Sequence, residues 1–141
     1  MKRLLLISFL FLLPSLSFTQ TNEEKVIGSC RANQFQLIQI SENEYKFYME
    51  SYRRITNGGW SDRRYNYTTQ TANFTGDKQT LIEIYNKIKS VIGKEEKVII
   101  ELGKKKLTVS GDGSTSVTLK LKGTRNYITE YCLDNLFKGI K

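Results

Sequence analysis

The chain has 141 residues, of which 39% are hydrophobic, 26% charged and 11% aromatic, a composition typical of one ordinary globular domain. It carries 22 Lys and Arg against 14 Asp and Glu, a formal net charge of +8, and it contains no histidine. The missing histidine excludes Ser-His-Asp and Cys-His nucleophilic catalysis, acid–base catalysis by an imidazole, and zinc sites with histidine ligands.

The first nineteen residues are typical of a secretory signal peptide. A positive start at Lys2 and Arg3 precedes an apolar run over 4–13, and Ser17 and Thr19 supply the small residues of a cleavage site. That run is about half the length of a membrane span, which disfavours the alternative of a membrane anchor. We therefore expect residues 1–19 to be a signal peptide and residues 20–141 one exported domain, secreted or periplasmic, with no integral membrane segment after signal removal.

The two cysteines, Cys30 and Cys132, are an even pair in a chain expected to be exported. Such pairs are oxidised by default, so we expect a Cys30–Cys132 disulfide. Lipidation of Cys30 is an alternative, but the polar stretch before it separates it from the apolar run. A catalytic thiol is another, disfavoured because no histidine is present to lower its pKa.

The first half of the mature chain alternates as strands do. The segments 34–40, 44–53 and 63–71 read as strands, the second most clearly, with Tyr45, Phe47 and Met49 on one side. A turn at residues 41–43 joins the first two, and Asn57 with the two glycines after it marks a loop between the second and third.

The period changes to that of a helix after residue 77. Apolar residues then recur at three- and four-residue steps as far as Ile92, which predicts an amphipathic helix of about four turns. Thr75 or Asp77 can cap its start, and Gly93 can adopt the left-handed conformation that ends a helix.

Three further strands and a short helix complete the prediction. The segments 97–102, 105–110 and 115–122 alternate, and Thr129 can cap a helix over 130–138. The order βββαβββα predicts a single α+β domain, in which one long amphipathic helix packs on one face of an antiparallel sheet and a short C-terminal helix follows.

The segment 53–65 is the candidate recognition site. It gathers four arginines and the single tryptophan of the chain around a flexible turn, at Arg53, Arg54, Trp60, Arg63, Arg64 and Tyr65. Guanidinium groups bind carboxylates and phosphates, and aromatic rings stack on sugars, bases or cations. The same residues also fit a solvated hairpin whose arginines keep an edge strand from pairing, with the indole folded onto the core.

Two weaker surface features accompany this segment. Lysines gather at 104–106, 120 and 122, where they also fit ordinary solubility and edge protection. Tyr48, Tyr52, Tyr65 and Tyr67 can form an aromatic ladder across two strands, which lines binding grooves in some proteins and stabilises sheets in others.

These features favour binding over catalysis, and we expect no enzyme, cofactor or metal site. The first hypothesis is an exported interaction protein, such as an inhibitor or an accessory subunit, that engages an acidic protein surface through the Arg/Trp hairpin. The alternative is binding of an anionic polymer, either an acidic polysaccharide or extracellular nucleic acid. A histidine-free hydrolase built on Glu50 or Asp62 is the residual alternative. Asp112 stands alone between two glycines, short of the acids that a calcium loop needs.

Overall fold

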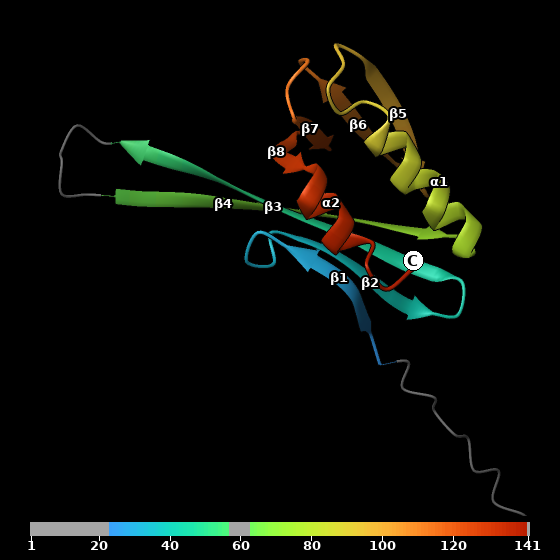
Figure 1. Ribbon diagram of the computed structural model, residues 1–141. Helices are drawn as coiled ribbons and strands as arrows, with labels where there is room; N and C mark the ends of the chain where they lie inside the picture. Colours follow the sequence, from blue (N-terminus) through green and yellow to red (C-terminus); the bar gives the residue numbers. More distant parts are fainter. Residues whose placement is uncertain (1–22, 57–62, 141) are drawn as a thin grey trace, which may run out of the picture.

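The computed structural model describes residues 23–56 and 63–140, so the predicted signal peptide lies outside the described residues. Within these ranges the chain forms eight strands and two helices (Figure 1). In chain order they are β1 (Lys25–Cys30), β2 (Phe35–Ser41), β3 (Glu44–Thr56), β4 (Arg63–Thr75), α1 (Lys78–Lys89), β5 (Lys97–Leu102), β6 (Lys105–Gly111), β7 (Ser116–Leu121), β8 (Thr124–Thr129) and α2 (Glu130–Leu136).

The predicted fold class was wrong. The strands form two separate four-stranded antiparallel sheets, in the orders β1-β2-β3-β4 and β5-β6-β7-β8. The molecule is therefore mostly β, and it lacks the single sheet covered by one long helix that the sequence pattern predicts for an α+β domain. The physical reason is that alternation marks strands but does not say which of them pair: after α1, β5 pairs with β6 and stands at the edge of the second sheet, so the two sets of four strands stay separate.

The two sheets share one core. The buried residues of both sheets and both helices belong to one hydrophobic cluster, and β8 contacts β3. Figure 1 shows α1 and α2 beside the two sheets. The largest fully buried side chains come from both sheets and both helices: Phe35, Leu37, Met49, Leu81, Ile88, Leu102, Leu107, Leu119, Leu121, Ile128, Leu133 and Leu136. One continuous apolar interior thus holds the described part of the chain together.

The first helix begins where the sequence places its cap. Asp77 accepts a hydrogen bond from the backbone N–H of Thr80, and the Thr80 hydroxyl accepts one from the backbone N–H of Asp77, which closes a capping box. The helix buries Leu81, Ile84 and Ile88 and ends at Lys89, so it has twelve residues and is shorter than predicted. Gly93 adopts a positive φ of 76° in the turn beyond the helix.

The predicted disulfide is confirmed. Cys30 at the end of β1 and Cys132 in α2 are bonded, with their Cα atoms 5.4 Å apart and the two residues 102 positions apart in sequence. The backbone of α2 lies so close to β1 that a Cβ on Gly28 would stand well inside van der Waals contact with the carbonyl oxygen of Leu136. The bond and this close approach together fix the last helix on the first strand.

A buried asparagine links the two sheets. The side-chain amide of Asn126 in β8 donates to the carbonyl of Glu50 in β3 at 2.7 Å, and its oxygen accepts from the guanidinium of Arg31 at 3.0 Å. Arg31 also donates to the carbonyl of Tyr127 at 2.6 Å, from a turn in which Arg31, Ala32 and Asn33 all have positive φ. Because buried polar groups must be hydrogen-bonded, this network fixes how the sheets sit together.

Candidate interaction surface

The β3–β4 hairpin extends beyond the sheet that carries it. Its two strands pair without a break from Glu44 opposite Thr75 to Thr56 opposite Arg63. The neighbouring strand β2 pairs with β3 only as far as Met49. The part of the hairpin beyond this point is a two-stranded ribbon that runs away from the body of the molecule, as Figure 1 shows. We call it the distal hairpin, residues 50–56 and 63–69.

Three tyrosines form an exposed cluster on one face of the distal hairpin. Tyr52 lies opposite Tyr67 in the register, and Tyr65 is two residues from Tyr67 on the same strand. The ring centroid of Tyr52 lies 5.8 Å from that of Tyr65 and 6.4 Å from that of Tyr67. The centroids of Tyr65 and Tyr67 are 6.5 Å apart. Their exposed fractions are 49% for Tyr52, 43% for Tyr65 and 64% for Tyr67. Aromatic rings at these separations attract one another, so the cluster forms a pre-arranged apolar surface.

The tyrosine predicted to continue this ladder has a different role. The hydroxyl of Tyr48 donates to the carboxylate of Glu50 at 2.8 Å. Partial burial raises the pKa of Tyr48 above its ordinary value, and the hydrogen bond to Glu50 adds to this effect. The phenol therefore stays protonated and holds the Glu50 carboxylate, which is one of the two acids considered for hydrolysis. The other, Asp62, lies outside the described residues.

The predicted recognition residues divide into two groups. Tyr65 belongs to the exposed cluster. The backbones of the four arginines lie in the distal hairpin, with Arg53 opposite Asn66, Arg54 opposite Tyr65, Arg64 opposite Ile55 and Arg63 opposite Thr56. Their side chains, and the whole of Trp60, lie outside the part of the chain that the structure describes. The register brings the backbones of all four arginines to the same ribbon as the tyrosine cluster.

The second basic group is spread over the other sheet. Lys106 and Lys120 stand on exposed positions of neighbouring strands, and Lys106 lies 3.8 Å from the Glu101 carboxylate across the β5–β6 pair. Lys105 instead donates to the backbone carbonyl of Thr71 at the edge of β4. Exposed pairs of this kind contribute little to stability.

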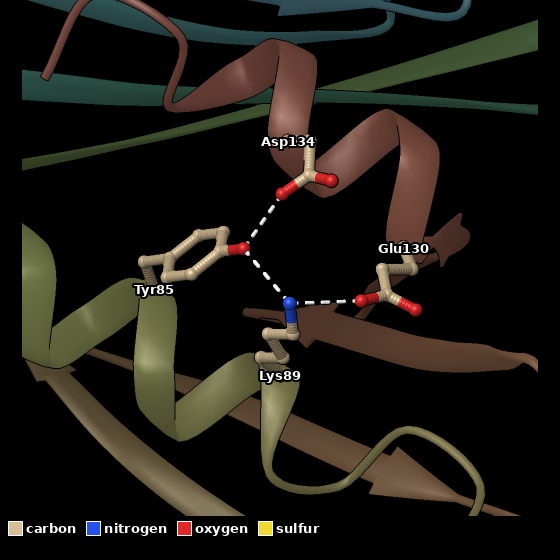
Figure 2. A network of polar contacts seen from close by, with 4 residues as sticks. All are labelled: Tyr85, Lys89, Glu130 and Asp134. Atoms are coloured by element: carbon tan, nitrogen blue, oxygen red, sulfur yellow. Dashed lines mark hydrogen bonds and ion pairs between the residues drawn. The ribbon is translucent and has the colours of Figure 1, made fainter. Parts of the chain in front are cut away.

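Sequence reasoning missed a network of polar contacts between the two helices, drawn in Figure 2. The hydroxyl of Tyr85 in α1 donates to the carboxylate of Asp134 in α2 at 2.6 Å. The ammonium of Lys89 lies 2.8 Å from the Glu130 carboxylate and 3.3 Å from the Tyr85 hydroxyl. Tyr85 fits the apolar stripe of the helix in the sequence, and Glu130 and Asp134 follow more than forty residues later, so no local pattern indicates this pairing.

This network connects the two helices. The hydrogen bond between Lys89 and Glu130, together with the contact between Lys89 and Tyr85, raises the pKa of Lys89 above its ordinary value. An amine that keeps its proton serves neither as a nucleophile nor as a general base at neutral pH. The network therefore joins α1 to α2 at the surface, where both members of the ion pair are about half exposed.

Neither a metal-binding cluster nor a membrane-spanning helix occurs in the described ranges. Within residues 23–56 and 63–140, no three Asp, Glu or Cys side chains gather closely enough to hold a metal ion. In the same ranges neither helix has the length and apolar character needed to cross a membrane.

Comparison with known proteins adds no relative. No protein-family model matches this chain, and no curated protein and no solved structure is significantly similar to it.

Proposed function

We propose that this chain is an exported binding protein that engages an acidic protein surface through its distal hairpin. The observation that carries the proposal is the exposed cluster of Tyr52, Tyr65 and Tyr67 on a ribbon that projects past the core. These rings contribute nothing to the interior, and aromatic side chains held in this way are enriched at protein interfaces.

The charge of the same ribbon supports an acidic partner. Arg53, Arg54, Arg63 and Arg64 lie on its two strands, and the whole chain has a formal net charge of +8. Arginine and tyrosine together are the residues that most often dominate binding energy at protein interfaces. A basic ribbon also speeds the encounter with an acidic partner through long-range attraction.

Export is part of the proposal because of the leader-like sequence at residues 1–19 and the disulfide. The Cys30–Cys132 bond fits an oxidising compartment, since cytosolic thiols are kept reduced. A partner is accordingly expected in the periplasm or outside the cell.

Charge-matched variants test the proposal. Arg54→Ala/Arg64→Ala removes two charges from the distal hairpin, and Lys106→Ala/Lys120→Ala removes two from the exposed face of the other sheet. Binding of fluorescent poly-L-glutamate is measured by anisotropy for both variants and the wild type, in the oxidised protein. We expect the hairpin variant to lose about tenfold or more in affinity, about 1.4 kcal/mol, and the lysine variant to lose less than about threefold.

Equal losses in both variants would show that net charge alone drives binding, and would refute the proposal. The same titration with polygalacturonate and a DNA duplex tests the anionic-polymer alternative. If only these polymers bind, with an affinity that falls steeply as salt is raised, the acidic-protein proposal is wrong and the polymer alternative replaces it.

A further inference from the structure

The direction of the backbone groups along β4 follows from the register. The N–H of Glu50 donates to the carbonyl of Gln34 at 2.7 Å, and the Glu50 carbonyl accepts from Asn126 on the same side. Since a residue in a strand directs both backbone groups to the same side, the even positions of β3 face away from β4. The unbroken pairing of β3 with β4 then directs the odd positions of β4 outward, away from the sheet.

The outward edge of β4 is closed at one end and open at the other. The ammonium group of Lys105 donates a hydrogen bond to the outward carbonyl of Thr71, and the backbone of Gly103 lies against the carbonyl of Asn73. Farther along, at Tyr65, Tyr67 and Thr69, no described residue donates to or accepts from the outward backbone groups. All three of these residues are exposed.

From Tyr65 to Thr69 this open edge lacks the usual protection against pairing. Natural edge strands are shortened, bulged, covered, interrupted by proline or protected by charged side chains. The segment from Tyr65 to Thr69 contains neither a proline nor a charged residue, and the charged Arg63 and Arg64 lie before it at the start of β4. Here β4 is thirteen residues long, is the last strand of its sheet and keeps one register with β3 throughout. An edge of this kind is the template that partner strands use when they add to a sheet.

We infer that the edge of β4 from Tyr65 to Thr69 pairs with an extended acidic segment of the partner. This inference rests on the proposed function and names the mode of recognition. The added strand forms backbone hydrogen bonds with the outward groups of Tyr65, Tyr67 and Thr69, while Lys105 on the carbonyl of Thr71 marks where the pairing ends. Side chains of the added strand on the tyrosine side pack on the exposed cluster.

The charge and shape at the closed end favour an acidic strand. A hollow of about 520 Å³ lies there, lined by Tyr45, Phe74, Leu102, Lys104 and Lys105 among others. A carboxylate at the end of the added strand meets the ammonium groups of this hollow. Glu44 also lines it, and the hydroxyl of Ser41 donates to the Glu44 carboxylate at 3.2 Å. A second copy of the basic chain is disfavoured as the occupant by its own net charge of +8.

A proline scan of the edge tests the inference. The probe is a fluorescent eight-residue peptide of alternating Glu and Val with blocked ends, titrated at low salt into the oxidised full chain. Thr69→Pro removes one outward N–H, which an edge strand tolerates, and Thr69→Ala is the control that keeps it. We expect Thr69→Pro to weaken peptide binding tenfold or more and Thr69→Ala to change it less than twofold. Equal binding by the wild type and Thr69→Pro, or no binding by the wild type, overturns the inference.

Amide hydrogen exchange gives a second test that needs no variant. Bound peptide is expected to slow exchange at the outward amides of Tyr65, Tyr67 and Thr69, and to leave Asn66 and Thr68, already paired with β3, nearly unchanged. Slowed exchange at these outward amides in the absence of peptide, together with a dimer in solution, would assign the edge to a second copy and contradict the acidic-strand inference. If Arg54→Ala/Arg64→Ala loses poly-L-glutamate affinity while the outward amides stay unprotected, the proposed function stands and only strand addition is refuted.

Discussion

Removing the Cys30–Cys132 bond is expected to destabilise the protein mainly through its unfolded state. The bond joins positions 102 residues apart, so it closes a loop that spans most of the chain when the protein unfolds. Loop-closure entropy for a loop of that size corresponds to about 4.7 kcal/mol at 25 °C, and measured losses for native disulfides are about 2 to 5 kcal/mol. We therefore expect Cys30→Ala/Cys132→Ala to lose about 2 to 5 kcal/mol of unfolding free energy.

Urea unfolding followed by circular dichroism measures this loss. The variant is also expected to have a larger m-value, because its unfolded chain is less compact and exposes more surface. Reduced wild type is the matched control and should reproduce the midpoint of the double variant. A loss below about 1 kcal/mol with an unchanged m-value would show that the bond restrains little of the unfolded chain, contrary to this prediction.

Three further predictions concern the contacts that fix the two sheets and the helices. Asn126→Ala should cost about 1 to 3 kcal/mol of unfolding free energy, measured in urea, because the Glu50 carbonyl loses the donor from β8 and the Arg31 guanidinium keeps only its hydrogen bond to the Tyr127 carbonyl. A loss near zero would contradict the linking role. Gly28→Ala should destabilise by about 1 to 3 kcal/mol and lower Tm, since its Cβ meets the backbone of α2; an unchanged Tm would show that α2 can move away freely. The capping hydrogen bonds from Thr80 lower the pKa of Asp77 below its ordinary value. The contribution of the Asp77 carboxylate to stability is therefore present above about pH 4 and lost as pH falls below about 3.9. Asp77→Asn should flatten this part of the stability–pH curve, and an unchanged curve would contradict the assignment.

Local pattern was enough to place most of the elements. Strand β5 has the predicted bounds, and Asp77 and Thr129 are the observed caps of the two helices. These features depend on neighbours in sequence, where alternation, helical period and cap chemistry are directly visible.

Strands β1 and β8 were not predicted, because in each of them the alternation of apolar and polar residues is interrupted. In β8 the inward positions include Thr124 and Asn126, so the segment does not alternate apolar with polar residues although its burial alternates strictly. Asn126 is tolerated there because its hydrogen bonds are satisfied across the two sheets. In β1 the register shifts between Val26 and Gly28, and this break interrupts the period of two.

The number of sheets could not be predicted from local sequence patterns, for a different reason. Alternation identifies a strand and its buried face, but it does not say which strand lies at each edge. The predicted single sheet needs β4 or an earlier strand to pair with one after α1, whereas in the structure each set of four strands forms its own sheet. The same limit applies to the candidate site, because the open edge of β4 exists only since β4 is the last strand of the first sheet.

A map of where poly-L-glutamate binds, made from backbone amide shifts of the isotope-labelled, oxidised protein, shows whether the distal hairpin is the binding surface. We expect the largest shift changes in the distal hairpin, at Tyr52, Tyr65 and Tyr67 and their neighbours. Changes centred instead on Lys106 and Lys120, or spread evenly over the basic surface, would rule out the distal hairpin as the binding surface.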